Sequence, residues 1–206
     1  MQREGWRFPP ERRHVLKDED RQRRLQPERI LDEADVQPGE TVVDVGAGPG
    51  FWTELLAKRV GPNGHVFAVD VEPVMLDELR TLVEERGLSN VDVVQSEETS
   101  IPLEEGIADL ILLIFVLHEP PDPMPFLAEI IRLLKPNGRV LVVDWQDWPT
   151  EQGPPLEVRI SQEEARALLG AAGLSAEVMI SPTRDAYVLL AREFRAGELE
   201  ITEPTV

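Results

Sequence analysis

A glycine-rich bend follows a short β-branched segment near residue 45, and its spacing suits close contact with a ligand. Residues 42–50 read Val-Val-Asp-Val-Gly-Ala-Gly-Pro-Gly. Glycine has no Cβ, so such a bend can pass close beneath a bound molecule. A dinucleotide fingerprint would need a further glycine at position 51, where this chain has Phe51. The bend therefore favours a ligand that contains adenosine but no diphosphate. Asp44 could hold the bend or accept a hydrogen bond from an ammonium group.

Carboxylates follow the next two expected strands. Asp70 lies 24 residues after Gly46, close to the spacing of about 20 residues at which an acidic side chain accepts hydrogen bonds from ribose hydroxyls. Glu97 and Glu98 follow the third expected strand. A carboxylate there could accept a hydrogen bond from an adenine amino group, and the Glu98 amide could serve a ring nitrogen. Each of these side chains could instead be a solvated carboxylate at the end of a strand.

Basic and aromatic side chains follow the fourth and fifth expected strands. His118 precedes Glu119, and because imidazole titrates near neutral pH, His118 could act as a general base. It could equally be structural and pack the loop. Trp145 and Trp148 could line a pocket for a ring or a cation, or form a hydrophobic plug under the following loop. The other histidines stand at no metal-ligand spacing from His118, so we expect no metal site.

The elements that must position these residues alternate between strands and helices. We expect strands at 41–45, 65–69, 91–94, 108–117, 139–143, 176–180 and 186–191, and helices at 28–34, 51–60, 73–86, 125–134 and 162–171. This alternation predicts a parallel sheet with helices on both faces. The short turn at 181–185 predicts that the last two strands form an antiparallel hairpin. Ligands bind such sheets beyond the carboxyl ends of the strands, where the candidate residues lie.

Residues from about 28 to 145 resemble the class I, seven-stranded S-adenosylmethionine-dependent methyltransferases. The sequence at 44–50 matches the family's first motif and Val69-Asp70 its acidic second motif, and further matches stand at 101–102, 108–110, 116–118 and 134–139. The resemblance is strongest to the type 11 group, which includes the ubiquinone- and menaquinone-biosynthesis enzymes. It implies an α/β fold with a Rossmann-like, doubly wound seven-stranded sheet, strand order 3-2-1-4-5-7-6 and strand seven antiparallel.

The resemblance also implies S-adenosylmethionine as the cofactor and transfer of its methyl group to a small-molecule acceptor that the motifs do not identify. It assigns cofactor contacts to Asp44, Gly46, Ala47, Gly48, Gly50, Asp70, Val71, Glu97, Glu98 and Leu117. The acceptor pocket would include His118, Glu119, Trp145 and Trp148. The chain has no cysteine, which argues against arsenite methylation, and no Asn-Pro-Pro-Tyr sequence after strand four, which argues against methylation of amide or base nitrogens.

Three other functions are compatible with parts of this pattern. A non-catalytic module that binds the same cofactor, or regulates through it, would keep the fold. A nicotinamide-dependent oxidoreductase is disfavoured by Phe51. An aminopropyltransferase would need paired acidic residues after strand four, where this chain offers only Glu119 and Asp122.

Charge and length suggest how the chain is organised. The 206 residues carry a formal net charge of −18, which disfavours nucleic-acid partners because phosphate backbones would be repelled. Residues 1–29 nevertheless hold nine basic and six acidic side chains. We divide the chain into an N-terminal arm (1–27), a methyltransferase domain (28–193) and an acidic tail (194–206). The arm could be a lid whose arginines close over the cofactor carboxylate, with Arg12, Arg13 and Arg24 as candidates.

The same composition bears on location and assembly. The chain lacks cysteine, a signal-like N-terminal segment and any apolar run near the roughly 20 residues that span a bilayer. We therefore expect a cytoplasmic protein without a membrane span. The sequence leaves a monomer and a homodimer equally open.

Overall fold

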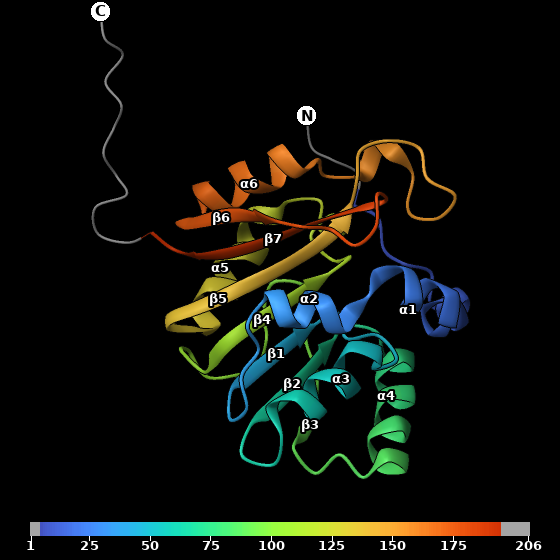
Figure 1. Cartoon of the computed structure of the whole chain (residues 1–206), viewed down its shortest axis with the longest axis vertical. Coiled ribbons are helices and arrows are strands. Elements are labelled where there is room, and N and C mark those ends of the chain that lie inside the picture. The colour runs from blue at the N-terminus through green and yellow to red at the C-terminus, as the bar shows by residue number, and fades with distance from the viewer. Residues whose placement is uncertain (1–4, 195–206) are drawn as a thin grey trace, which may run out of the picture.

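In the computed structural model, which describes residues 5–194, seven strands form one sheet in the order β3-β2-β1-β4-β5-β7-β6 (Figure 1). Strand β7 runs antiparallel to β5 and β6, and the remaining pairs are parallel. Strand order and strand direction confirm the fold predicted from the sequence. The strands are β1 (Thr41–Val45), β2 (His65–Asp70), β3 (Val91–Gln95), β4 (Ala108–Ile114), β5 (Leu134–Trp145), β6 (Leu174–Met179) and β7 (Ala186–Glu193).

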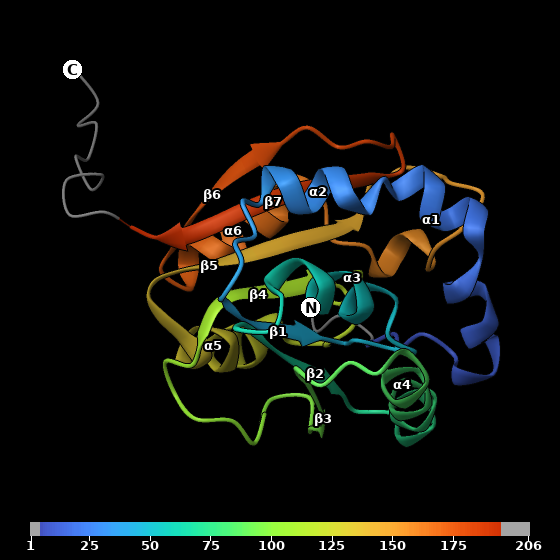
Figure 2. The same ribbon diagram turned by 60° about the horizontal axis from the view of Figure 1, so that its bottom comes forward.

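Helices cover both faces of this sheet (Figure 2). One buried cluster joins α2, α3 and α4 to one face, and a second joins α5 and α6 to the other. The helices are α1 (Glu19–Leu25), α2 (Pro27–Glu33), α3 (Phe51–Val60), α4 (Pro73–Arg86), α5 (Pro123–Leu133) and α6 (Gln162–Ala171), with 3₁₀ helices at Pro10–Lys17 and Leu156–Val158. No helix within residues 5–194 has both the length and the apolar character needed to cross a lipid bilayer.

The alternation of side chains along β4 explains why two helical layers are needed. Leu110 and Leu112 belong to the cluster under α2, α3 and α4, whereas Ile111 and Leu113 belong to the cluster under α5 and α6. All four are fully buried. A strand that is apolar on both faces is stable only when both faces are covered, so β4 occupies the middle of the sheet.

The expected boundaries differ from the observed ones most at the end of β4 and the start of β5, and a residue with a left-handed backbone stands at each place. The other boundaries agree or differ by one or two residues. The strand expected at 108–117 ends at Ile114, because Phe115 has φ +60° and turns the chain. Leu117 is fully buried all the same, so the apolar run gave no sign of the turn. The strand expected to begin at residue 139 begins at Leu134 and contains Asn137 with φ +66°, and α5 accordingly ends at Leu133.

Arg139 on β5 ties the sheet to the segment that enters β1. Its guanidinium forms a two-point ion pair with the Glu40 carboxylate, with N–O distances of 2.8 and 2.9 Å. It also donates to the carbonyl oxygens of Ala34, Asp35 and Asp109 at 2.8, 2.8 and 3.2 Å. The Arg139 side chain is only 8% exposed, so its partners must replace the water that it loses.

The Arg139→Ala substitution should lower the free energy of unfolding by about 3 kcal/mol, because it removes the buried guanidinium that pairs with Glu40 and donates to three carbonyls. Urea denaturation monitored by circular dichroism measures this loss. As a control, Arg29→Ala breaks an exposed pair with Glu33 on α2 and should cost only about 0.5 kcal/mol. Equal effects of the two substitutions would contradict the role given to Arg139.

Candidate active site

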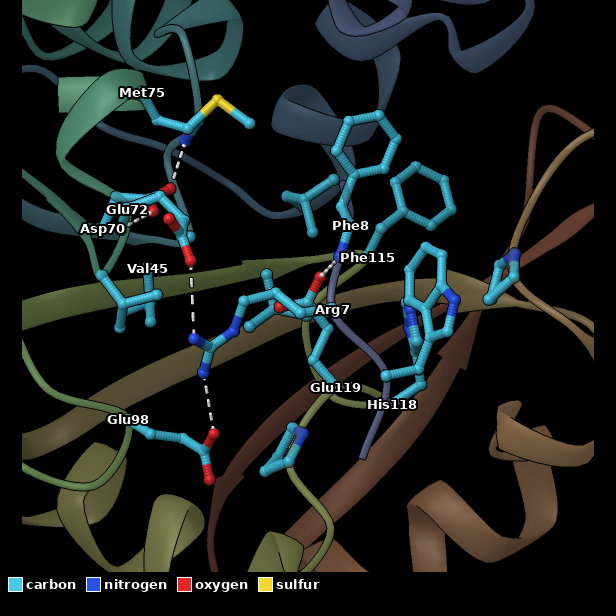
Figure 3. A pocket seen from close by; sticks show the side chains of 18 of the residues that line it. Arg7, Phe8, Val45, Asp70, Glu72, Met75, Glu98, Phe115, His118 and Glu119 are labelled. Atoms are coloured by element: carbon cyan, nitrogen blue, oxygen red, sulfur yellow. Dashed lines mark hydrogen bonds and ion pairs between the residues drawn. The ribbon is translucent and has the colours of Figure 1, made fainter. Parts of the chain in front are cut away.

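A cavity of about 330 Å³ opens where the parallel strands end. Strands β1 to β5 each bring a residue to its wall, at or just after the strand's carboxyl end: Val45, Asp70, Ser96, Ile114 and Trp145. The N-terminal arm adds Trp6, Arg7, Phe8, Arg12, Val15 and Leu16 to the lining. Figure 3 shows Arg7 and Phe8 of this arm at the cavity. Strand β1 lies between β2 and β4, so the cavity occupies the point at which the strand order reverses, as expected for a ligand site in such a sheet.

The glycine bend after β1 forms the floor of the cavity. Gly46 has φ +69°, and a Cβ built on it would lie 2.4 Å from Val116 Cγ2. Its N–H donates to the Val69 carbonyl at 2.8 Å, which fixes the bend against β2. Gly46 and Gly48 line the cavity. Ala47 and Gly50 are buried and are not among the residues that line it, so they shape the bend from behind.

Asp70 joins that bend to the loop after β2. One carboxylate oxygen accepts the Gly48 N–H at 2.8 Å and the other accepts the Glu72 N–H at 2.9 Å. Burial raises the pKa of Asp70, and these backbone donors partly counteract the rise. Each carboxylate oxygen has a second lone pair, so Asp70 can still accept hydrogen bonds from a ligand. The ribose contact proposed for Asp70 is compatible with this geometry.

Asp44 lies behind the bend and is not among the residues that line the cavity. It is 2% exposed and accepts a hydrogen bond of 2.7 Å from the Thr53 hydroxyl on α3. Burial, and to a smaller extent the charge of Asp70, raises the pKa of Asp44 to about 6. Asp44 was expected either to hold the bend or to accept a hydrogen bond from an ammonium group. Its hydrogen bond with Thr53, behind the bend, is compatible with the first role.

Of the residues expected around the nucleoside, some line the cavity and one does not. Val71, Glu97 and Glu98 line the cavity, and the Glu98 carboxylate accepts a hydrogen bond from Arg7 at 2.9 Å. The Glu97 residue is exposed. Leu117 is fully buried and packs with the layer that contains α5; it is not among the cavity-lining residues, so its position does not support direct contact with a cofactor.

His118 is held by Asp144, which was not among the predicted site residues. The imidazole Nδ1 lies 2.7 Å from Asp144 Oδ1, and the His118 N–H donates to Oδ2 at 3.2 Å. Both side chains are 1% exposed. A carboxylate only accepts, so Nδ1 carries the proton in the neutral ring and Nε2 is the basic nitrogen. The position of Asp144 at the end of β5, equivalent to that of Asp70 at the end of β2, is the sequence signal that could have revealed it.

Glu119 is a partly buried carboxylate on the same wall. It accepts a hydrogen bond of 3.1 Å from the Phe8 N–H of the arm. Loss of water around it raises the pKa of Glu119 to about 7, although the charges of His118 and Arg7 act in the opposite direction. Glu119 can therefore change its charge near neutral pH.

Of the two tryptophans, only Trp145 is among the cavity-lining residues. Its ring packs on Phe115 with centroids 4.6 Å apart, and the Arg159 guanidinium lies 5.5 Å from its centroid. Trp148 is 42% exposed. Its carbonyl accepts from Arg159 at 2.8 Å, an anchor that fixes the loop without bringing the ring to the cavity. The position of Trp148 therefore does not support the pocket role expected for it.

The carboxylate acceptors of the cavity suit a positively charged ligand that carries hydroxyl groups. Asp70, Glu72, Glu97, Glu98 and Glu119 line the cavity, against the two cations Arg7 and Arg12 of the described lining. Glycine backbone at the floor permits close approach, and carboxylates accept from hydroxyl and amino groups. These features fit the adenosine and the sulfonium of S-adenosylmethionine.

Comparisons with known proteins agree with the fold and with the cofactor class. Residues 42–138 match the family profile described as a methyltransferase domain. The crystal structure of an S-adenosylmethionine-dependent methyltransferase from Aquifex aeolicus superposes with a TM-score of 0.87 at 34% sequence identity, covering 91% of this chain and 100% of that one.

Two curated proteins match over shorter stretches. The demethylmenaquinone methyltransferase of Geobacillus sp. (strain WCH70) is 34% identical over 133 residues, which are 65% of this chain and 53% of that protein. An uncharacterized 37.1 kDa protein in transposon TN4556 of Streptomyces fradiae is 39% identical over 131 residues, which are 63% and 37% of the two chains. The present chain thus spans about half, or less, of the length of these relatives.

The Asp70→Asn substitution should weaken the binding of S-adenosylhomocysteine by about tenfold or more, because an amide N–H would face a backbone N–H where a carboxylate now accepts it. Isothermal titration calorimetry measures the affinity. Asp92→Asn on β3, whose side chain is 65% exposed and pairs with His65, is the matched control and should bind as the unmodified chain does. An unchanged affinity in Asp70→Asn would contradict the role of Asp70.

The raised pKa of Glu119 predicts a pH-dependent stability. Between its ordinary value of 4.5 and about 7, the folded chain holds a proton on Glu119 that the unfolded chain releases, so the free energy of unfolding falls as pH rises through this window. Asp44 acts in the same direction. Glu119→Gln removes one contribution and should reduce the loss between about pH 5 and 8 by about 2 kcal/mol.

Urea denaturation at the two pH values measures the difference between the unmodified chain and Glu119→Gln. Glu97→Gln alters an exposed carboxylate of the same wall and should follow the unmodified chain. If Glu119→Gln also follows it, the carboxyl group of Glu119 ionises normally and the prediction is wrong.

Proposed function

This chain belongs to the S-adenosylmethionine-dependent methyltransferases, and we propose that it methylates a small molecule in the cavity beneath its N-terminal arm. The observation that carries the proposal is the wall formed by the arm. The Trp6 ring lies 5.6 Å from the His118 imidazole, centroid to centroid, and the Phe8 N–H donates to the Glu119 carboxylate at 3.1 Å. A cavity of about 330 Å³ lies at the lower end of the range for small-molecule sites, roughly 300–1,000 Å³.

The acceptor we favour is a flat, largely apolar ring with an ionisable proton at or near the methylated atom. Aromatic side chains supply the matching surface through Trp6, Phe8, Phe115 and Trp145, since rings stack or meet edge to face with other rings. The activity named for the Geobacillus relative, methylation of demethylmenaquinone, is consistent with such an acceptor. Identity over half of that protein's length supports the class of acceptor rather than one compound.

In the proposed mechanism, S-adenosylmethionine supplies a methyl group on a positively charged sulfur. The glycine bend and Asp70 hold the cofactor's nucleoside, and the arm excludes water from the acceptor. His118 Nε2 accepts the proton of the acceptor as its nucleophilic atom is methylated. Asp144 fixes the tautomer of His118 and stabilises the imidazolium that forms, so Asp144 is a positioning residue.

The His118→Gln substitution should lower the rate of S-adenosylhomocysteine formation by about 10²–10³-fold, because no base remains to take the proton. Asp144→Asn should lower it by about tenfold or more, since the amide can hold the wrong tautomer. A panel of hydroxylated aromatic compounds serves as acceptors, and product is followed by liquid chromatography. Both variants should bind S-adenosylhomocysteine with nearly unchanged affinity.

The matched control is His65→Gln, which changes a partly exposed histidine at the start of β2 and should leave the rate unchanged. Full activity of His118→Gln would refute the base. Cofactor binding without turnover of any acceptor in the panel would instead support a non-catalytic binding module.

A further inference from the structure

A tripeptide of the arm, Trp6 to Phe8, contacts both halves of the site. On the nucleoside half, the Arg7 guanidinium lies 2.9 Å from the Glu98 carboxylate and 3.5 Å from that of Glu72. Glu72 follows β2 and Glu98 follows β3, so a single side chain bridges two loops. Figure 3 shows the guanidinium between these two carboxylates.

The flanking residues of the tripeptide contact the acceptor half. The Trp6 N–H donates to the Glu119 carbonyl at 3.3 Å, and the Phe8 N–H donates to the Glu119 carboxylate at 3.1 Å. The Trp6 ring lies 5.6 Å from the His118 imidazole, centroid to centroid. The arm is therefore attached to the turn that carries the proposed base.

The three arginines expected to form the lid have different surroundings from Arg7. Arg12 lines the cavity, whereas Arg13 pairs with Glu78 on α4 and Arg24 lines a separate small cavity beside Trp145. Arg7 is thus the arginine of the described arm that pairs with carboxylates of the cavity wall. Its guanidinium matches two carboxylates at once because its N–H groups form a planar fork.

We propose that Arg7 is a positioning residue: its ion pairs with Glu72 and Glu98 hold the arm so that Trp6 and Phe8 form the acceptor wall. This inference rests on the proposed function. Arg7 bridges the two loops that would flank the nucleoside, so we expect these pairs to open when the cofactor exchanges. Release of the arm for exchange also removes the acceptor wall, so occupancy of the two halves is coupled through the tripeptide.

The first experiment measures exchange of S-adenosylhomocysteine by stopped-flow tryptophan fluorescence. Arg7→Ala should raise both the association and the dissociation rate by about fivefold or more, with little change in affinity. Raising salt from about 50 mM to about 500 mM should speed exchange in the unmodified chain but not in Arg7→Ala, because salt screens partly exposed ion pairs. Arg7→Lys, which keeps the charge but lacks the fork, should show intermediate rates.

The second experiment needs no cofactor and follows tryptic cleavage after Arg12 and Arg13. Arg7→Ala should speed this cleavage by about fivefold or more, because the arm detaches more often. Arg29→Ala removes an exposed arginine of α2 that pairs with Glu33 and is the matched control in both experiments. It should behave as the unmodified chain does.

The outcomes separate this inference from the proposed function. Exchange and cleavage rates of Arg7→Ala equal to those of the unmodified chain would overturn the positioning role and leave methyl transfer standing. A lower affinity with an unchanged association rate would also overturn it, because Arg7 would then hold the ligand rather than the arm. If S-adenosylhomocysteine did not bind the unmodified chain, the proposed function would fail and the cleavage rates alone would decide the role of Arg7.

Discussion

The whole site depends on the carboxylate of Asp70 and the hydrogen bonds that it accepts from two backbone N–H groups. These bonds join the glycine bend after β1 to the loop after β2, so the floor and one wall of the cavity share a single buried charge. The bend itself has a left-handed backbone at Gly46, next to Val116. A larger residue there would move the floor and the turn before His118 together, which couples the cofactor half to the acceptor half.

Carboxyl groups held out of water are the second constraint on the site. Burial raises the pKa of Asp44 to about 6 and that of Glu119 to about 7. Ionisation of these two carboxyl groups therefore costs free energy in the folded chain. A cationic ligand relieves part of this cost when it binds. Arg7 supplies a positive charge to the same wall from the arm. Arg7 of the arm and a cationic ligand are thus attracted by the same group of carboxylates.

The sequence predicted the sheet closely because strand formation here follows from local pattern. Runs such as the one through β4 are apolar on both faces and therefore central. The prediction of strand ends from the sequence failed where a single residue adopts a left-handed backbone, as Phe115 and Asn137 do. At Phe115 the apolar run continues through the turn, so hydrophobicity could not mark the end of the strand. The tail expected at 194–206 lies outside the described residues except for its first, and the limits proposed for the arm and the domain stay predictions.

The sequence by itself determined the cofactor family and the floor of the site. The glycine bend, Asp70 and the carboxylates after β3 lie in short motifs whose meaning depends on near neighbours. Only the tertiary structure decided which side chains complete the site. Asp144 reaches His118 across 26 residues and Arg7 reaches Glu98 across 91. The end of a strand can mark Asp144 as a candidate site residue, but no local pattern tells which side chain it contacts. They meet because the parallel strands end at one edge of the sheet and the arm folds back over that edge.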